Sequence, residues 1–318
     1  QVLVDPIDSL ELSDGQQQIV DLPLGAVALA VGWPGSGKTT ALKAHFLRLA
    51  RETSPENILV IAANRTAAAK LRDELALAFQ GSTLGPTART LSSIAFSILR
   101  HSALEQGSKL PELISGSEQD VILAELVELF NKGVLPEPSF PKHITTTVMG
   151  LSGFRAELRD VIAVSIEHSI SPQALAKLGV EKNKPEWVGV SEIYAHYLAE
   201  LEKPHNSHRF DPSALLVEAA KVLRAGVVPS DLQKHVKHIL VDDAQELTPA
   251  AVELLGALTE LGAGLVLFGD PDVSTLGFRA ADPEAMHRFA DSLAKKRGVQ
   301  LVQTYIYPAH ASHPADIS

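Results

Sequence analysis

Eight residues near the start of the chain have the types and spacing needed to hold a row of phosphates. They read GWPGSGKT and match the pattern G-x-x-x-x-G-K-[ST]. Glycines let backbone N–H groups approach phosphate oxygens without a side-chain clash, and the helix predicted next adds its positive dipole end. The pattern therefore predicts a nucleoside triphosphate site in which Lys38 reaches the β- and γ-phosphates and the Thr39 hydroxyl ligates Mg²⁺. The expected contacts of this loop are Gly32, Pro34, Gly35, Ser36, Gly37, Lys38, Thr39 and Thr40.

A pair of carboxylates at the end of another apolar strand is suited to complete this site. The segment HILVDDAQELTP spans residues 238–249. We expect Asp242 to orient Mg²⁺ through its water shell and Asp243 to polarise the water that attacks the γ-phosphate. Two solvated carboxylates at a strand end are the alternative, and the phosphate-binding loop earlier in the chain favours the metal site.

The elements that must position these groups alternate between strands and helices in two blocks. Apolar runs predict strands at residues 26–31, 58–62, 238–242 and 264–268. Helical patterns occupy residues 38–52, 66–79 and 249–261, and residues 95–100 read as part of another helix. Continuous apolar strands separated by helices are typical of a parallel sheet covered on both faces. The predicted fold class is therefore α/β.

The region between the two blocks, residues 103–209, has helical periodicity and no convincing strand. Amphipathic helices are predicted at residues 117–130 and 186–201. Helix starts are marked by an N-cap residue followed by proline in Ser171-Pro172, Asp211-Pro212 and Thr248-Pro249. We therefore predict an α/β domain built from residues 1–102 and 210–318, interrupted by an all-helical inserted domain at 103–209.

The composition limits the classes of function. The 318 residues include no cysteine, which excludes disulfides, thiol catalysis and zinc–thiolate sites. A formal net charge of -10 disfavours a surface that grips nucleic acid throughout, so any DNA path is expected to be a local groove. The apolar run at 22–33 is too short to cross a bilayer, and no Lys or Arg precedes Lys38 to begin a secretory signal. We expect a cytoplasmic protein with no membrane partner.

Further segments occur in an order that matches a known family. They are LSDGQQQIV at 12–20, ILVIAANRTAAAKLRDEL at 58–75, ARTLSSIAFSILR at 88–100, FDPSALLVEAAKVL at 210–223, LVDDAQE at 240–246 and FGDPDVSTLGFRAADP at 268–283. Together with the phosphate-binding loop, this order resembles the N-terminal half of UvrD/Rep-type DNA helicases, and within them the AdnA/AdnB helicase–nuclease subunits. The resemblance implies a RecA-like P-loop NTPase domain with a helical insert, using ATP and Mg²⁺.

The resemblance also implies roles for single residues. Gln16 would read the adenine edge, Tyr305 would stack on adenine, and Gln245 would be the coupling glutamine. Single-stranded DNA would be contacted by Arg65, Thr90, Ser92, Phe278 and Arg279. Other arginines that could line a groove for the DNA backbone are Arg72, Arg89, Arg155 and Arg159. A solvated helix face is the alternative for the three in helical segments, Arg72, Arg155 and Arg159.

The chain departs from the family pattern at positions that matter for hydrolysis. Asp243 replaces the usual Glu, and one methylene fewer should draw the carboxylate back by about 1.5 Å. Val273 stands where a glutamine that senses the γ-phosphate is usual. In LVQTYIYPAH, Ile306 stands where an arginine would stabilise the transition state. We expect the chain alone to bind ATP and to hydrolyse it poorly.

Two functions follow from these motifs. The first is the ATP-binding N-terminal portion of a helicase that couples ATP hydrolysis to translocation on single-stranded DNA in repair or recombination. Its partner would be a second RecA-like domain or a motor or nuclease subunit. The second is a degenerate ATP-binding subunit with a structural role and little hydrolysis, which Asp243, Val273 and Ile306 favour. A P-loop kinase of small molecules is disfavoured by DDAQE and by the long insert.

Two histidine pairs have the spacing H-x-x-H, namely His205/His208 and His310/His313. Because no third ligand lies close in the sequence, loop histidines are favoured over a metal site. Trp187 and Tyr194 in the insert are expected to be core residues rather than platforms for bases.

Overall fold

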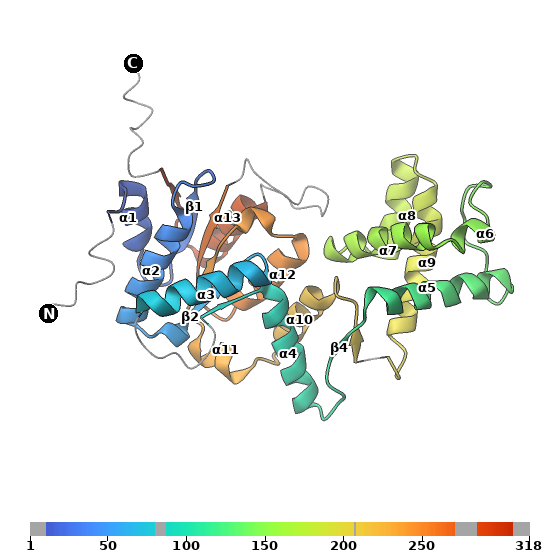
Figure 1. The fold of residues 1–318 in the computed structure, drawn as a ribbon, viewed down its shortest axis with the longest axis horizontal. Helices are drawn as coiled ribbons and strands as arrows, with labels where there is room; N and C mark the ends of the chain where they lie inside the picture. Colours follow the sequence, from blue (N-terminus) through green and yellow to red (C-terminus); the bar gives the residue numbers. More distant parts are fainter. Residues whose placement is uncertain (1–10, 80–86, 207, 271–284, 308–318) are drawn as a thin grey trace, which may run out of the picture. The chain divides into compact units, whose positions relative to one another are not determined.

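The computed structural model describes residues 11–79, 87–206, 208–270 and 285–307 (Figure 1). These residues form two compact units. The first contains the described residues up to Ile98 and from Ala220 onward, and the second is Leu99–Ala219. The domain boundaries expected at 102/103 and 209/210 remain predictions.

Among the described residues, six strands of the first unit form one sheet in the order β3-β2-β6-β7-β1-β8. All neighbours in this sheet are parallel. The strands are β1 Val27–Val31, β2 Ile58–Ile61, β3 Ala88–Arg89, β6 His238–Val241, β7 Gly264–Gly269 and β8 Val302–Tyr305. The carboxyl ends of all six strands therefore lie at one edge, which is the edge where α/β sheets bind ligands.

Helices cover both faces of this sheet, so strand side chains are buried on either side. On one face, α1 (Asp14–Val20), α2 (Lys38–Glu52) and α3 (Arg65–Phe79) share an apolar cluster with the strands. The strand residues of this cluster include Ala28, Ala30, Val60, Leu240, Val266 and Phe268. On the face opposite α2, α12 (Pro249–Thr259) and α13 (Ala285–Arg297) pack against each other, and α13 also packs against β1 and β7 (Figure 1). Burial on both faces explains why these strands read as continuous apolar runs.

The predicted α/β fold with a parallel sheet is confirmed, and α2 has the predicted bounds of residues 38–52. β3 and β8 were not predicted. β3 has two residues, and β8 is an edge strand whose Gln303 and Tyr305 are exposed, so its sequence VQTY lacks an apolar run. The apolar run at 22–33 contains β1. None of the helices in the described ranges has the length and apolar character needed to cross a membrane.

Helices build the second unit around a core of their own. Most of its buried residues come from five helices: α5 (Gly116–Asn131), α6 (Thr146–Met149), α7 (Ser152–Glu167), α8 (Pro172–Glu181) and α9 (Glu186–Leu201). Tyr194 is buried in this core and Trp187 packs against it, as predicted. The prediction that the insert has no strand is wrong, because β4 (Glu112–Leu113) pairs in parallel with β5 (Arg209–Phe210). Two short strands that pair across the whole insert leave no local sequence pattern.

Two of the three predicted helix starts are confirmed. The Ser171 hydroxyl accepts the Ala174 N–H at 3.2 Å, and the Thr248 hydroxyl accepts the Ala251 N–H at 3.2 Å. The third is wrong, because α10 (Leu215–Arg224) begins beyond Asp211. The Asp211 carboxylate instead accepts hydrogen bonds in the core of the second unit, from the Ser213 N–H at 2.8 Å, Gln119 Nε2 at 2.8 Å and the Tyr197 hydroxyl at 2.6 Å. Residues 95–100, predicted to be part of a helix, lie within α4 (Leu91–Glu105).

Candidate nucleotide-binding site

The predicted phosphate-binding loop lies between the carboxyl end of β1 and the first turn of α2. Its glycines are required by close packing and by backbone conformation. Gly37, the N-cap of α2, has φ 97°, and a Cβ there would collide with Gln16 Nε2. A Cβ on Gly32 would lie 2.8 Å from the Ile306 carbonyl oxygen. The loop is therefore pressed against α1 on one side and against the end of β8 on the other.

Lys38 is folded over this loop. Its Nζ donates to the carbonyl oxygens of Gly32 at 2.5 Å and Trp33 at 3.0 Å. Burial lowers the pKa of the ammonium, and the nearby carboxylates of Asp270, Asp243 and Asp242 oppose that shift. The charge that was predicted to meet phosphates is thus held at the mouth of the loop by weak neutral acceptors, which an anion can replace.

Asp242 and Thr39 meet although they are far apart in the sequence. Asp242 follows β6, and its Oδ2 lies 3.3 Å from the Thr39 hydroxyl, which donates to it. Burial raises the pKa of Asp242 to about 6, with a further contribution from the neighbouring Asp243. A carboxylate and a hydroxyl are hard oxygen donors of the kind that Mg²⁺ prefers, so the residues present fit this ion.

Asp243 has a left-handed backbone conformation, with φ 51° and ψ 45°. Its N–H donates to Asp242 Oδ1 at 3.2 Å. Its own Oδ1 accepts from Gln245 Nε2 at 3.3 Å, and Gln245 Oε1 accepts from the Asp270 N–H at 3.1 Å. Gln245 therefore connects the Asp243 carboxylate to the end of β7. This arrangement is suited to coupling the ends of β6 and β7.

Gln16 lies beside the loop, but its amide is already engaged within the protein. Its Oε1 accepts the Ser13 N–H at 2.9 Å in the capping box of α1, and its Nε2 donates to the Gly37 carbonyl at 3.1 Å. Reading the adenine edge, as predicted, requires this amide to exchange partners. In the structure Gln16 ties α1 to the last glycine of the loop.

The end of β8 forms the other side of the site. Tyr305 is 54% exposed, and its hydroxyl accepts from Gln303 Nε2 at 3.1 Å. Ile306, at the position expected for an arginine, is fully buried in the apolar cluster under the loop. Its N–H donates to the Val31 carbonyl at 2.7 Å, which holds this segment against the start of the loop.

The described candidates for DNA contact follow the carboxyl ends of β2 and β3. Arg65 and Ser92 are exposed, and the Thr90 hydroxyl accepts the Ser93 N–H at 3.2 Å at the start of α4. They lie at the same edge of the sheet as the phosphate-binding loop. Phe278 and Arg279 lie outside the described residues, as does Val273.

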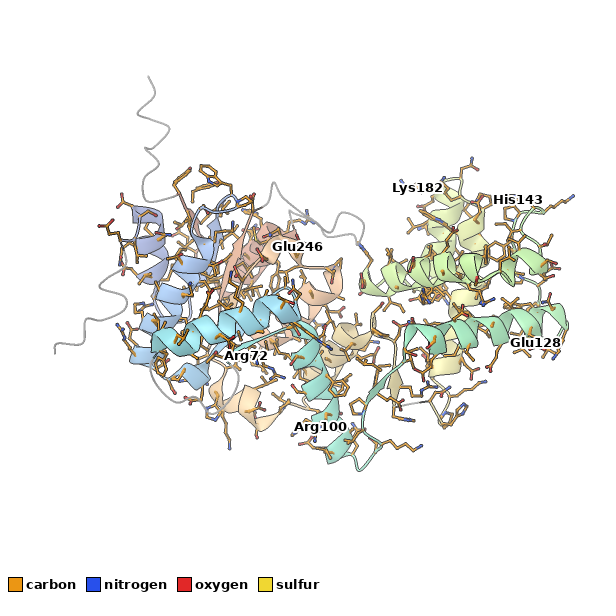
Figure 2. The ribbon with its side chains drawn as sticks, in the orientation of Figure 1. Arg72, Arg100, Glu128, His143, Lys182 and Glu246 are labelled. Carbon is orange, nitrogen blue, oxygen red and sulfur yellow. The ribbon has the colours of Figure 1, made fainter. Side chains whose placement is uncertain are left out.

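The other arginines have different environments. Arg72 is exposed on α3 (Figure 2). Burial lowers the pKa of Arg89, whose guanidinium donates to the Ser93 carbonyl at 2.9 Å and to the Ser97 hydroxyl at 3.1 Å. The solvated face considered for Arg155 is wrong, because its guanidinium makes a bidentate pair with Asp120 at 2.8 and 2.9 Å and is 14% exposed. Arg159 donates to the Gly116 carbonyl at 3.1 Å.

Sequence reasoning missed Asp270 and the partner of Trp33. Asp270 follows the apolar strand β7 as Asp242 follows β6, so the same signal could have found it. Trp33 contacts Tyr307, which the sequence places far away. Of the histidine pairs, His310/His313 lies outside the described residues. In the part that the structure describes, no group of three or more His, Cys, Asp or Glu side chains is arranged to hold a metal ion.

Comparison with known proteins finds a family and several relatives. The family described as "UvrD/REP helicase N-terminal domain" matches residues 12–294. The chain is 23% identical over 315 residues to a protein named DNA helicase II from Haemophilus influenzae, covering 96% of this chain and 40% of that protein. It is 24% identical to DNA helicase IV from Escherichia coli, covering 91% of this chain and 44% of that protein. It is 26% identical to ATP-dependent DNA helicase PcrA from Bacillus subtilis, covering 92% and 37%. The chain thus spans less than half the length of these relatives.

Proposed function

The chain belongs to the UvrD/REP helicase N-terminal domain family, and from this premise we propose that it is the ATP-binding portion of an ATP-dependent DNA helicase. The longer protein would couple ATP hydrolysis to movement along single-stranded DNA in repair or recombination. Relatives named as DNA helicases support this proposal over nearly the whole chain.

The observation that carries the proposal is the meeting of two distant motifs. Thr39, in the first turn of α2, lies 3.3 Å from Asp242 at the end of β6, directly beside the loop that holds Lys38. A phosphate-binding loop without a carboxylate could bind many anions. The addition of a buried carboxylate with a hydroxyl favours a phosphate chain that carries a divalent cation.

Each group has a proposed task. Backbone N–H groups of residues 35 and 37–39 bind phosphate oxygens. Lys38 leaves the Gly32 and Trp33 carbonyls to pair with the β- and γ-phosphates. Thr39 and Asp242 hold Mg²⁺, which, when bound, would offset the phosphate charge. Asp243 polarises water, and Gln245 keeps that carboxylate in place. Gln16 and Tyr305 hold the adenine.

Substitution of the loop lysine tests this site. We predict that Lys38→Ala abolishes binding of ATP with Mg²⁺ in isothermal titration calorimetry, because no other basic side chain is proposed to pair with the phosphates. Lys70→Ala provides a matched control, since Lys70 is exposed on α3 and makes only a 3.9 Å surface pair with Glu74. Unchanged ATP affinity in Lys38→Ala would contradict the assigned site.

A second candidate function, a degenerate ATP-binding subunit with a structural role, is favoured by two observations. Asp243 is short and its carboxylate is held by Gln245, and Ile306 supplies no charge near the loop. Under this candidate, single-stranded DNA leaves the ATPase rate of the full-length parent protein unchanged.

The finer assignments are also proposals. We propose that residues 1–102 and 210–318 form the RecA-like domain and that 103–209 form its insert. The likeness to AdnA/AdnB subunits and the cytoplasmic location rest on sequence alone. Arg65, Thr90, Ser92, Phe278 and Arg279 are the proposed DNA contacts, and a second RecA-like domain or a motor or nuclease subunit is the proposed partner. Crosslinking of labelled single-stranded DNA to the parent protein, followed by peptide mapping, tests the contact residues.

A further inference from the structure

Two aromatic side chains join the phosphate-binding loop to the end of β8. The rings of Trp33 and Tyr307 meet edge to face, with centroids 5.3 Å apart and planes at 67°. The backbone sets them opposite each other, because Val31 is the register partner of Tyr305 and the Ile306 N–H donates to the Val31 carbonyl. Trp33 and Tyr307 therefore continue the parallel β1–β8 register beyond the strands themselves.

This contact lies at the surface and is made by the loop itself. Trp33 is 49% exposed, and the next two loop residues are exposed as well. The exposed turn that begins at Trp33 has little buried apolar surface to fix its position. An edge-to-face pair is one of the few stabilising contacts that an exposed turn of this kind can make.

The backbone of Trp33 carries an oxygen that organises the rest of the loop. Its carbonyl accepts the Ser36 N–H at 3.1 Å, which closes the turn, and Lys38 Nζ at 3.0 Å. Fixing the side chain of Trp33 therefore also fixes the acceptor of the lysine that is proposed to meet the phosphates. On the other side of the contact, Tyr307 is linked through the chain to Tyr305. Only Ile306 lies between them, and its burial anchors both tyrosines.

We propose that Trp33 and Tyr307 form an aromatic clasp that positions the phosphate-binding loop for its nucleotide. The clasp ties the phosphate side of the site to the strand end that carries Tyr305. This inference rests on the proposed function, because it names positioning residues for the same site. With the clasp broken, residues 33–35 gain conformations that must be lost again on binding, so the affinity for ATP falls.

A double-mutant cycle tests the clasp by calorimetric titration with ATP and Mg²⁺. Trp33→Ala and Tyr307→Ala are each expected to weaken binding about two- to tenfold, which corresponds to the usual worth of one aromatic pair. The double variant should bind no more weakly than the weaker single variant, because each substitution removes the same contact. Tyr307→Phe keeps the ring and should retain the parent affinity. Leu77→Ala, an exposed residue of α3, is the matched control.

A spectroscopic signal distinguishes positioning from general stability. The chain has two tryptophans, so Trp187→Phe leaves Trp33 as the only indole. ATP is expected to change its emission, because Lys38 leaves the Trp33 carbonyl as the phosphates bind. Additive losses, unchanged affinity in both single variants, or a thermal unfolding midpoint that falls in step with affinity would each overturn the clasp while leaving ATP binding by the parent chain intact. If the parent chain itself fails to bind ATP, the proposed function is overturned and the clasp with it.

Discussion

Asp243 combines a short side chain with a backbone conformation that most residues avoid. Its φ of 51° lies in the left-handed region, where Asp and Asn are several-fold enriched over larger residues. The carboxylate is held from one side by Gln245, at 3.3 Å, and the backbone N–H is held by Asp242. The carboxylate proposed to act on water is therefore held in one position, and the length of the side chain decides how far it reaches.

We predict that Asp243→Glu raises the rate of ATP hydrolysis. The extra methylene moves the carboxylate forward, and since a misplacement of about 1 Å can cost about 100-fold in rate, the gain can approach that size. The larger residue also fits the left-handed conformation less well, which should lower the free energy of unfolding by about 1 kcal/mol. Phosphate release measures the rate and urea unfolding measures the stability. Asp243→Asn is the control without a charge, and no gain with Glu would mean that another group limits hydrolysis.

His45 makes the stability of the first unit depend on pH. It lies on α2 with 2% exposure, and burial lowers its pKa to about 4 from 6.5, despite the Val20 carbonyl 3.2 Å from Nδ1. Between these values the unfolded chain takes up a proton that the folded chain does not. The stability is therefore complete above about pH 6.5 and falls as the pH falls toward 4, by about 3 kcal/mol from this residue.

Urea unfolding at several pH values between 4 and 7.5 measures this effect. His45→Leu should flatten much of the dependence, although burial also lowers the pKa of His238 and leaves a remainder. His205→Ala, at an exposed position, should leave the dependence as it is in the parent chain. A pH profile that is the same in His45→Leu and in the parent would show that His45 is not its source.

Strands and helices with a continuous local pattern of apolar residues could be predicted from the sequence. Elements whose structure depends on a segment far away in the sequence could not. β1 and α2 are continuous patterns that stand on their own, so their bounds and the loop between them follow from sequence. β4 and β5 gain their structure only by pairing across the insert, and Asp211 follows a capping pattern yet serves the core of the second unit. In the candidate site, the residues of the phosphate-binding loop and of the later motifs could be identified from the order of the motifs along the sequence. The engagement of the Gln16 amide and the pairing of Trp33 were not, because both depend on contacts with another segment.

The close approach of α9 to the segment before α6 depends on a glycine. A Cβ on Gly189 would lie 2.6 Å from the Phe140 ring, which is too close without a shift of the ring or the helix. We predict that Gly189→Ala lowers the free energy of unfolding of the chain by about 1–3 kcal/mol, as overpacking does in other cores. Gly153→Ala in α7 is the matched control, because a Cβ there meets nothing within 4 Å.

The control should be neutral or stabilising by up to about 1 kcal/mol, since alanine favours a helix over glycine. Urea unfolding followed by circular dichroism compares the two variants with the parent chain. Equal stability of both alanine variants would contradict the tight packing at Gly189. ATP affinity is expected to be unchanged in both, because neither glycine belongs to the first unit.

At the scale of the whole molecule, every described group of the proposed nucleotide site belongs to the first unit. The loop, Asp242, Gln245 and the end of β8 all lie at the carboxyl edge of one sheet. We therefore expect the groups proposed to bind ATP to come from the first unit. Hydrolysis is different, because the position expected for a transition-state arginine is the buried Ile306, and the chain spans less than half the length of its relatives.

We predict that the chain alone binds ATP but hydrolyses it slowly and without response to single-stranded DNA, whereas the full-length parent protein responds. Ile306 is common to both proteins, so the gap must come from a charge partner that the rest of the parent protein supplies. Such a partner is worth about 10²–10³ in rate at the transition state, and a gap of at least that size is expected between the two proteins. Phosphate release with and without an oligothymidine, at low and moderate salt, measures it, since contacts to the DNA backbone weaken as salt rises. Lys38→Ala in the parent protein sets the background. A response by the chain alone would mean that residues 1–318 couple DNA binding to hydrolysis by themselves. No response by the full-length parent protein would favour the second candidate function, a degenerate ATP-binding subunit with a structural role.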